Sequence, residues 1–271
     1  MILDFSKYEG AGNDFVLVDG REGNVELTRE ETQALCDRHF GIGADGLMIL
    51  GRSDRADFSM RYFNSDGRGA EMCGNGARCI ALFAHHLGIG GERKRFEGAD
   101  GMHTARVESL SHHAGTVTIG MRDVERVEHG DGYLFLDTGV PHYVAPCDDL
   151  RGVDVHTRGA AVRYDPRWSA TGGTNVDFMQ LLAEGRIAVR TYERGVEGET
   201  LACGTGATAA AIAAHLLTGG LRTRFEVGVE GGLLEVWFTP CPDGRFREIH
   251  LKGPARKVFE GRIDTNNFAK K

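Results

Sequence analysis

Two short motifs combine a cysteine with glycines at the start of a predicted helix. The first, "CGNGARC", begins at Cys73, and the second, "CGTGATAA", begins at Cys203. A polar turn precedes each cysteine, so we expect the unpaired N–H groups and the positive end of a helix to face each thiol. Such a site favours the thiolate, and the glycines let the backbone approach an anion closely. Each motif therefore predicts a thiolate beside a cradle for a carboxylate.

The two motifs belong to a repeat that covers about half the chain. Displacing the sequence by 130 positions aligns "CGNGARCIALFAHHL" with "CGTGATAAAIAAHLL" and Tyr62 with Tyr192. With one more residue of offset, "ADGLMIL" aligns roughly with "NVDFMQL". This period is too long for a solenoid and indicates two copies of one unit. Such copies often pack as a pseudo-dimer, which would bring both thiols to one interface.

Two opposed thiols suit the inversion of a carbon that bears a hydrogen. Inversion needs a base on one face and an acid on the other, because a single base tends to return the proton to the side from which it came. The competing interpretation is a redox pair, although redox dithiols usually lie close in sequence. An amino-acid-binding or redox-sensing module with a disulfide thus stays open as an alternative. No Cys or His cluster has the spacing of a metal site, so we expect no metal.

Composition limits the class of protein. With 271 residues the chain is long enough for two medium domains. Its net charge of -7 argues against a nucleic-acid partner. No stretch predicts a membrane span, and the start lacks the pattern of a secretory leader. The six cysteines have no Cys-x-x-Cys spacing, so we expect reduced thiols and a cytoplasmic location.

The coarse pattern of elements is mostly β. Short apolar runs such as "DFVLVDG", "GLMILG" and "RIAVRTYERG" alternate with turn signals and predict strands. Helical periodicity is confined mainly to residues 29–38, 77–87 and 207–217. The last two of these ranges follow the two cysteine motifs, so each copy of the repeat is expected to have one such helix.

Further short motifs are distributed along nearly the whole chain. They are "GAGNDF", "GIGADG", "RYFNSDG", "DTGVPHYV", "GTNVDF", "YERGVEGET" and "GPARKVFEG". Together with the cysteine motifs they resemble the diaminopimelate epimerase family along nearly the whole chain. The resemblance implies an α+β fold of two similar domains related by pseudo-twofold symmetry, each a β-sheet wrapped around a central helix. It divides the chain into residues 1–120, residues 121–261 and a tail, 262–271, that returns to the first domain.

The resemblance also implies roles for individual residues. Cys73 and Cys203 match the catalytic pair, and His142 and Glu193 match residues that tune the thiols. The residues that match substrate contacts are Asn13, Asn64, Gly74, Asn75, Asn175, Glu193, Arg194, Gly204 and Thr205. Arginine can bind a carboxylate with two parallel hydrogen bonds and glutamate can accept from an ammonium group. A zwitterionic substrate with two charged ends fits this set.

The activity implied by the resemblance is interconversion of LL- and meso-2,6-diaminopimelate, in lysine and peptidoglycan precursor biosynthesis. We expect no cofactor and no pyridoxal phosphate, a small diamino dicarboxylic acid as substrate, no nucleic acid, no membrane, and a homodimer. The alternative is a related two-cysteine racemase, such as a proline racemase-like enzyme. Many family members have Gln where this chain has Gly46 and Asn where it has Val140. Selectivity for the distal end of the substrate is therefore the least defined property.

Overall fold

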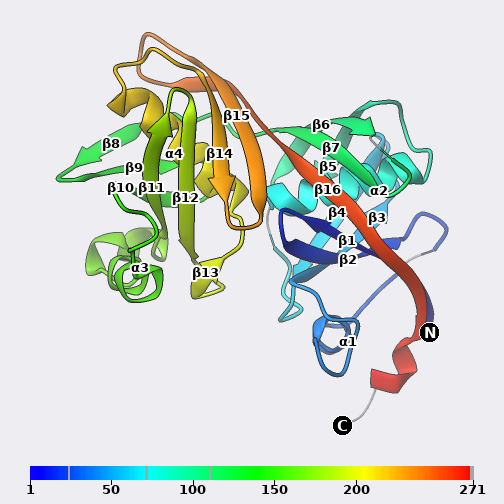
Figure 1. Ribbon diagram of the computed structural model, residues 1–271. Coiled ribbons are helices and arrows are strands. Elements are labelled where there is room, and N and C mark those ends of the chain that lie inside the picture. The colour runs from blue at the N-terminus through cyan, green and yellow to red at the C-terminus, as the bar shows by residue number, and fades with distance from the viewer. Residues whose placement is uncertain (24, 71–72, 110, 269–271) are drawn as a thin grey trace. The chain divides into compact units, whose positions relative to one another are not determined.

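The computed structural model describes residues 1–23, 25–70, 73–109 and 111–268 of the chain. These residues form two compact units, Met1–Ile119 with Pro254–Lys271 and Gly120–Gly253 (Figure 1). The first unit therefore resumes at Pro254, before the tail expected at 262–271. The reason is one long strand, whose residues from Arg256 to Asp264 pair with the N-terminal strand. Residues 269–271 of the expected tail lie outside the described residues.

The first unit is a closed barrel of eight strands. The strands are β1 (Ile2–Gly10), β2 (Asn13–Asp19), β3 (Gly46–Gly51), β4 (Phe58–Asn64), β5 (Arg93–Gly98), β6 (Gly101–Ser109) and β7 (Ala114–Gly120), together with the part of β16 (Phe246–Asp264) that begins at Pro254. They are hydrogen-bonded in this order, and antiparallel pairing of β1 with β16 closes the ring. Closure leaves the ring without an open edge.

Helix α2 (Gly74–His86) lies among the strands of this barrel and contacts β1, β2, β3 and β6 (Figure 1). Every residue from Gly74 to Ala84 is buried. A helix enclosed on all sides needs small or apolar side chains around its whole circumference, and the "GNGARCIALFA" run supplies mostly these. The exceptions are Asn75 and Arg78, and Arg78 has no exposed surface.

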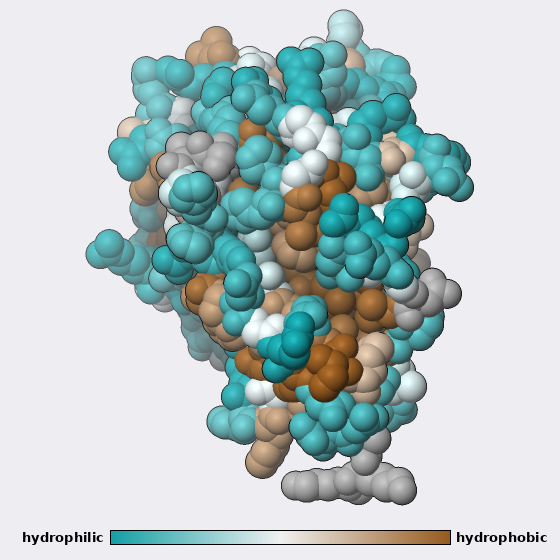
Figure 2. All heavy atoms as spheres, turned by 90° about the vertical axis from the view of Figure 1, so that its right-hand side faces the viewer, coloured by the Kyte–Doolittle hydropathy of each residue, from teal (hydrophilic) through white to brown (hydrophobic). Residues whose placement is uncertain are grey.

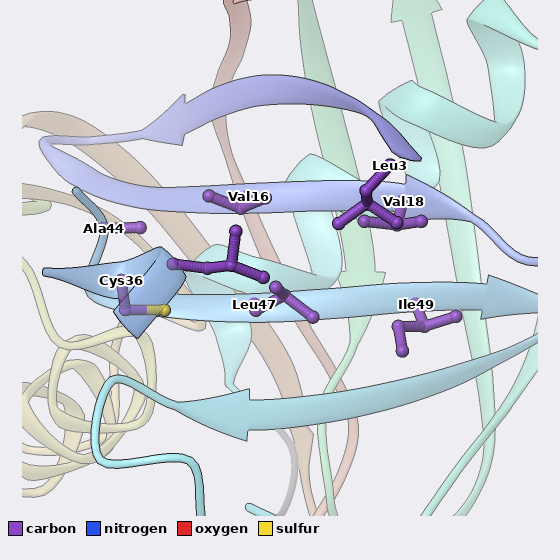
Figure 3. Close-up of a cluster of buried hydrophobic side chains, with 8 residues drawn as sticks. Leu3, Val16, Val18, Cys36, Ala44, Leu47 and Ile49 are labelled. Atoms are coloured by element: carbon purple, nitrogen blue, oxygen red, sulfur yellow. The ribbon is translucent and has the colours of Figure 1, made fainter. Parts of the chain in front are cut away.

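Helix α1 (Arg29–Cys36) covers the outside of β2 and β3. Thr28 and Glu31 form a capping box, in which each side chain accepts a hydrogen bond from the other's backbone N–H. Figure 3 shows Cys36 of this helix in one apolar cluster with Val16 and Leu47. A short 3-10 helix, η2 (Thr265–Phe268), follows β16 and also contacts α1.

The second unit has the same kind of architecture. Its strands are β8 (Val127–Gly130), β9 (Tyr133–Asp137), β10 (Pro141–Pro146), β11 (Asn175–Ala183), β12 (Arg186–Glu193), β13 (Gly198–Thr200), β14 (Arg224–Val229) and β15 (Gly232–Pro240), together with the first part of β16. The hydrogen-bonded order is β16-β15-β14-β12-β11-β10-β9-β8, with β13 paired to β12. An isolated bridge between Val124 and Phe246 joins the segment before β8 to β16.

Helix α4 (Gly204–Leu217) is the counterpart of α2. It contacts β9, β10, β11, β12, β14 and β15, and its residues Gly204 and Gly206 to His215 are buried. Its sequence, "GTGATAAAIAAHLL", is rich in alanine, the strongest helix former and small enough to fit inside a curved sheet. Two helical elements were not expected from the sequence: α3 (Val155–Arg163) and the 3-10 helix η1 (Pro166–Thr171).

The strand pairing relates the two units element by element. In each unit an antiparallel pair is followed by a parallel neighbour and then an antiparallel one: β1 to β4 in the first unit and β9 to β12 in the second. Met48 pairs with Tyr62, and Val176 pairs with Tyr192. The two tyrosines are not equivalent, because Tyr62 and Met48 face α2, whereas Tyr192 and Val176 lie in the apolar cluster with α3. Met48 lies against Gly76 of α2 as Asp177 lies against Gly206 of α4, so Asn175 corresponds to Gly46, not to Ala44 as in the sequence alignment.

Several large apolar side chains are exposed on the surface of the described residues. Figure 2 shows one face, on which apolar residues form a strip between hydrophilic ones. In the first unit the exposed apolar residues include Ile2, Val258 and Phe259. Within the described part of the chain, no helix combines the length and the apolar character required to cross a membrane.

Candidate active site

Cys73 is the N-cap residue of α2, as its motif predicts. Its backbone is extended, with φ −112° and ψ 119°, and its side chain makes no capping hydrogen bond to the helix. The thiol is half-buried, and its Sγ lies 3.8 Å from Oδ1 of Asn13. As the first two residues of α2, Gly74 and Asn75 have N–H groups with no acceptor within the helix. The site thus combines a thiol, an amide and a helix N-terminus.

Two charged residues fix the amide orientations beside Cys73. Nη2 of Arg78 donates to Oδ1 of Asn75 at 3.0 Å, so the Nδ2 of Asn75 must be the atom that donates to Oδ1 of Asn13, at 3.4 Å. On its other side, Asn13 donates from Nδ2 to Oδ2 of Asp45. Asn13 therefore presents its carbonyl oxygen to Cys73.

Arg78 is a buried cation on the same helix as Cys73. It also donates to the carbonyl oxygens of Gly74, at 3.3 Å, and Pro254, at 3.2 Å. Burial lowers the pKa of its guanidinium from the ordinary value. At the position of Arg78 in the second copy of the motif stands Thr208. The two helices therefore differ in charge, although their backbones correspond.

Cys203 is the N-cap residue of α4 and is almost fully buried. Its Sγ accepts a hydrogen bond from the N–H of Gly206 at 3.4 Å and lies 3.3 Å from Oγ1 of Thr205. Gly204 and Thr205 open the helix, so their N–H groups have no acceptor within it. The geometry of the second motif thus also agrees with the sequence.

The protonation state of Cys203 differs from the expectation. Burial raises the pKa of its thiol well above the ordinary value, and the negative charges of Glu193 and Asp177 raise it further. The hydrogen bonds from Thr205 and Gly206 lower it by less. The helix end alone favours the thiolate, but desolvation and two carboxylates outweigh it, and Cys203 is a thiol near neutral pH.

A buried polar chain lies behind Cys203. His142, on β10, places Nδ1 2.6 Å from Oδ2 of Asp177, on β11, and both side chains are completely buried. The other ring nitrogen of His142, Nε2, lies 3.4 Å from Nδ2 of Asn175. The parallel register that sets His142 beside Asn175 explains this contact. Oδ1 of Asp177 accepts from the hydroxyl of Thr191 at 2.7 Å.

The "YERG" residues follow at the end of β12. The backbone N–H of Arg194 donates to Oδ1 of Asn175 at 2.7 Å, and its Nη1 donates to the carbonyl of Thr171 at 2.8 Å. Oε2 of Glu193 accepts from the hydroxyl of Thr200 at 2.9 Å. Both side chains are half-buried. The backbone N–H of Arg194 therefore fixes the orientation of the Asn175 amide, whereas the Arg194 side chain is bound to Thr171.

Each unit gathers part of the predicted site. In the first, Asn13, Cys73 and Asn75 are in contact, whereas Asn64 is exposed at the end of β4 and has no described contact with them. The residues of the second unit that gather around the start of α4 and the ends of β10 to β12 are His142, Asn175, Glu193, Arg194, Cys203, Gly204 and Thr205.

Three residues of these networks were missed by sequence reasoning: Arg78, Asp45 and Asp177. Each had a signal. Arg78 interrupts an otherwise small and apolar helix, and Asp45 lies in the "GIGADG" motif. Asp177 follows Asn175 by two residues, so both side chains lie on the same face of one strand.

The structure explains why position 46 is a glycine, where the resemblance leads one to expect Gln. A Cβ at this position would lie 2.6 Å from the ring of Tyr62 and 2.7 Å from the carbonyl oxygen of Phe63. Tyr62 therefore occupies the space into which a longer side chain at residue 46 would extend. Val140 lies in the turn before β10, where its carbonyl oxygen accepts from the N–H of Thr138 at 3.2 Å.

Comparison with known proteins identifies the family. The sequence profile described as diaminopimelate epimerase matches residues 5–127 and 134–258. The chain belongs to the diaminopimelate epimerase family. Among members of the diaminopimelate epimerase family, the chain is 43% identical to the enzyme of Flavobacterium psychrophilum over 262 residues, covering 95% of this chain and 98% of the relative. It is 41% identical to that of Chlorobaculum tepidum, covering 94% and 98%.

Solved structures outside the close relatives share the fold. A phenazine biosynthesis protein of the PhzF family from Bacillus anthracis superposes with a TM-score of 0.75 at 15% identity, covering 97% of this chain and 99% of that one. A probable proline racemase from Agrobacterium radiobacter gives a TM-score of 0.72 at 14% identity, covering 97% and 93%. At these identities the likeness concerns the fold alone, which the diaminopimelate epimerase family therefore shares with other proteins.

Proposed function

We propose that this protein interconverts LL- and meso-2,6-diaminopimelate by moving a proton at one α-carbon, as an isomerase of lysine and peptidoglycan precursor biosynthesis. The observation that carries the proposal is the duplicated cysteine site: Cys73 and Cys203 each cap an enclosed helix, at equivalent places in two units of matching strand order. Membership of the diaminopimelate epimerase family supplies the substrate.

The two thiols divide the proton transfer between them. One enters as thiolate and removes the α-hydrogen, and the other enters as thiol and delivers a proton to the opposite face. The buried, protonated state of Cys203 supports its role as the acid when LL-diaminopimelate is the substrate, with Cys73 as the base. After one turnover the protonation states are exchanged, and the same pair then acts on the meso isomer.

The helix N-termini supply the charge stabilisation that thiols alone lack. An amino-acid α-hydrogen is a very weak acid, so negative charge develops on the adjacent carboxylate as the proton leaves. The N–H groups at the start of the two helices meet this charge; they belong to Gly74, Asn75, Gly204 and Thr205. Each such donor is worth about 2.7–4 kcal/mol in comparable sites.

The remaining predicted contacts hold the ends of the substrate. The amide groups of Asn13, Asn64 and Asn175 donate to carboxylates or accept from ammonium groups without adding charge. Arg194 binds a carboxylate, and Glu193 accepts from an ammonium group. The fixed amide orientations of Asn13 and Asn175 support this assignment, because each residue has a defined acceptor or donor before substrate arrives.

Three wider expectations are part of the same proposal. A pseudo-twofold axis relates the two units, supported by their matching strand order. The enzyme works in the cytoplasm, supported by six cysteines that form no disulfide within the described residues. It forms a homodimer, which light scattering at several concentrations tests directly; a monomer at all concentrations contradicts it.

The decisive experiment is to incubate the purified chain with LL-diaminopimelate without added cofactor and to separate the isomers chromatographically. We expect approach to an LL/meso equilibrium from either side. Proline and hydroxyproline serve as comparison substrates, since a related racemase would act on a substrate with one carboxylate and no distal amine. Turnover of proline without turnover of diaminopimelate would favour that alternative and contradict the proposal.

A further inference from the structure

Asp177 is a completely buried carboxylate for which the proton transfer described above has no role. It accepts hydrogen bonds from Nδ1 of His142 and from the hydroxyl of Thr191. A buried, charged carboxylate is costly unless its surroundings compensate it. A buried carboxylate beside a candidate catalytic thiol therefore calls for a functional explanation.

The hydrogen bonds around His142 allow only one arrangement of protons. The backbone N–H of Arg194 can only donate, so it fixes Oδ1 of Asn175 as the acceptor and turns Nδ2 toward His142. Nε2 of His142 must then accept, and its proton resides on Nδ1. Nδ1 donates to Oδ2 of Asp177 and the hydroxyl of Thr191 donates to Oδ1, so both oxygens act as acceptors, as those of a carboxylate do. A doubly protonated ring, or a proton on Nε2, would set two donors against each other.

Asp177 also lies directly against the first turn of α4. A Cβ added to Gly206 would be only 2.3 Å from Oδ1 of Asp177. The positive helix end helps to compensate the buried carboxylate. The same negative charge acts on Cys203, and Glu193 of β12 is the other charged group that faces this thiol.

The carboxylate is a feature of the second unit only. In the first unit Met48 occupies the equivalent position, because it lies against Gly76 of α2 as Asp177 lies against Gly206 of α4. Conversely, the buried cation Arg78 corresponds to Thr208. The Cys203 helix thus has a buried anion at its start, whereas the Cys73 helix has a buried cation.

We propose that Asp177 is a positioning residue: its buried charge holds His142 as the neutral tautomer with the proton on Nδ1, and it keeps Cys203 protonated in the resting enzyme. This inference rests on the proposed function, because a two-base epimerisation needs one thiol of the pair to start with its proton. Asp177 acts through His142 and Cys203 and does not itself touch the substrate.

The first test measures the tautomer in the full chain without ligand. Nitrogen-15 labelling of histidine gives distinct spectra for the two neutral tautomers and for the doubly protonated ring, and a His142→Asn variant assigns the signal. We expect a protonated Nδ1 and an unprotonated Nε2 at neutral pH. A proton on Nε2, or on both nitrogens, would overturn the proposal.

The second test removes the charge of Asp177 and keeps its shape. In Asp177→Asn, the amide oxygen can still face Nδ1 of His142 while the amide nitrogen donates to Thr191. The titration of Cys203 is followed by ultraviolet thiolate absorbance, with the corresponding Cys203→Ala protein as blank. We expect the midpoint to fall by about one pH unit or more, because a like charge has been removed. The matched control, Thr191→Val, loses a hydrogen bond to Asp177 but keeps the charge, so its midpoint stays in place.

An unchanged midpoint in Asp177→Asn, or an equal fall in Thr191→Val, would refute the charge effect. If Asp177→Asn does not fold, the wild-type chain still decides: titration of Cys203 at or below the ordinary thiol value of 9.0 would contradict the proposal. Both tests use the resting protein without substrate. Failure of the epimerase activity and failure of this inference are therefore distinguishable.

Discussion

Replacing Gly206 by alanine tests the polar chain behind Cys203 from the backbone side. The new Cβ would lie 2.3 Å from Oδ1 of Asp177, whereas ordinary contact begins at 3.4 Å, so the carboxylate must move by about 1.1 Å (3.4 − 2.3). A shift of this size breaks its 2.6 Å hydrogen bond to His142. A hydrogen bond to a charged group is worth about 1.5–3 kcal/mol. We therefore expect kcat for LL-diaminopimelate to fall about 10- to 150-fold.

The repeat supplies the matched control. Gly76 stands at the same position in the first motif, and a Cβ there would meet the terminal Cε of Met48 at 1.9 Å. The end of a methionine side chain can rotate away, so Gly76→Ala should lose much less activity. The assay is the initial rate of isomer formation, with thermal unfolding as a check, because Gly→Ala within a helix itself favours folding. Full activity in Gly206→Ala, or an equal loss in Gly76→Ala, would refute the reasoning.

Two further predictions concern the cysteines. Cys73→Ala and Cys203→Ala should each abolish epimerisation, while a single serine variant should still eliminate a leaving group from a halogenated analogue, which needs only one base; epimerisation by either alanine variant would contradict this. The raised pKa of Cys203 means that above pH 9.0 the unfolded chain loses this proton while the folded chain keeps it, so folding stability falls as pH rises. Denaturant unfolding should show a smaller fall in Cys203→Ala, and identical pH dependence in the two proteins would count against a buried thiol.

Much of the site could be predicted from the sequence because its signals are local. A cysteine before Gly-x-Gly and a helix-like run defines an N-cap, and both Cys73 and Cys203 occupy that position. The repeat likewise predicted two units of matching topology. What local patterns could not give were effects of burial. The thiolate expected at Cys203 is wrong because desolvation and two carboxylates outweigh the helix end.

Long-range pairing also lay beyond the sequence patterns. The contacts of Asp177 come from β10 and α4, which bring His142 and Gly206 against it from distant parts of the chain. The division of β16 between the two units is of the same kind, because nothing in "KGPARKVFEG" states where one set of partners ends and the next begins. Helix α3 was missed because "VHTRGAAVR" has no clear apolar stripe.

The central claim, a two-base transfer through Cys73 and Cys203, is tested most directly by a single turnover of LL-diaminopimelate in deuterated water. The acid thiol exchanges its proton with solvent before substrate binds, and it delivers that hydrogen to the face opposite the one from which the base removes its own. We predict that meso-diaminopimelate formed in the first turnover carries deuterium at the inverted carbon, while unreacted substrate carries none. Product that keeps the substrate's own hydrogen would contradict the claim.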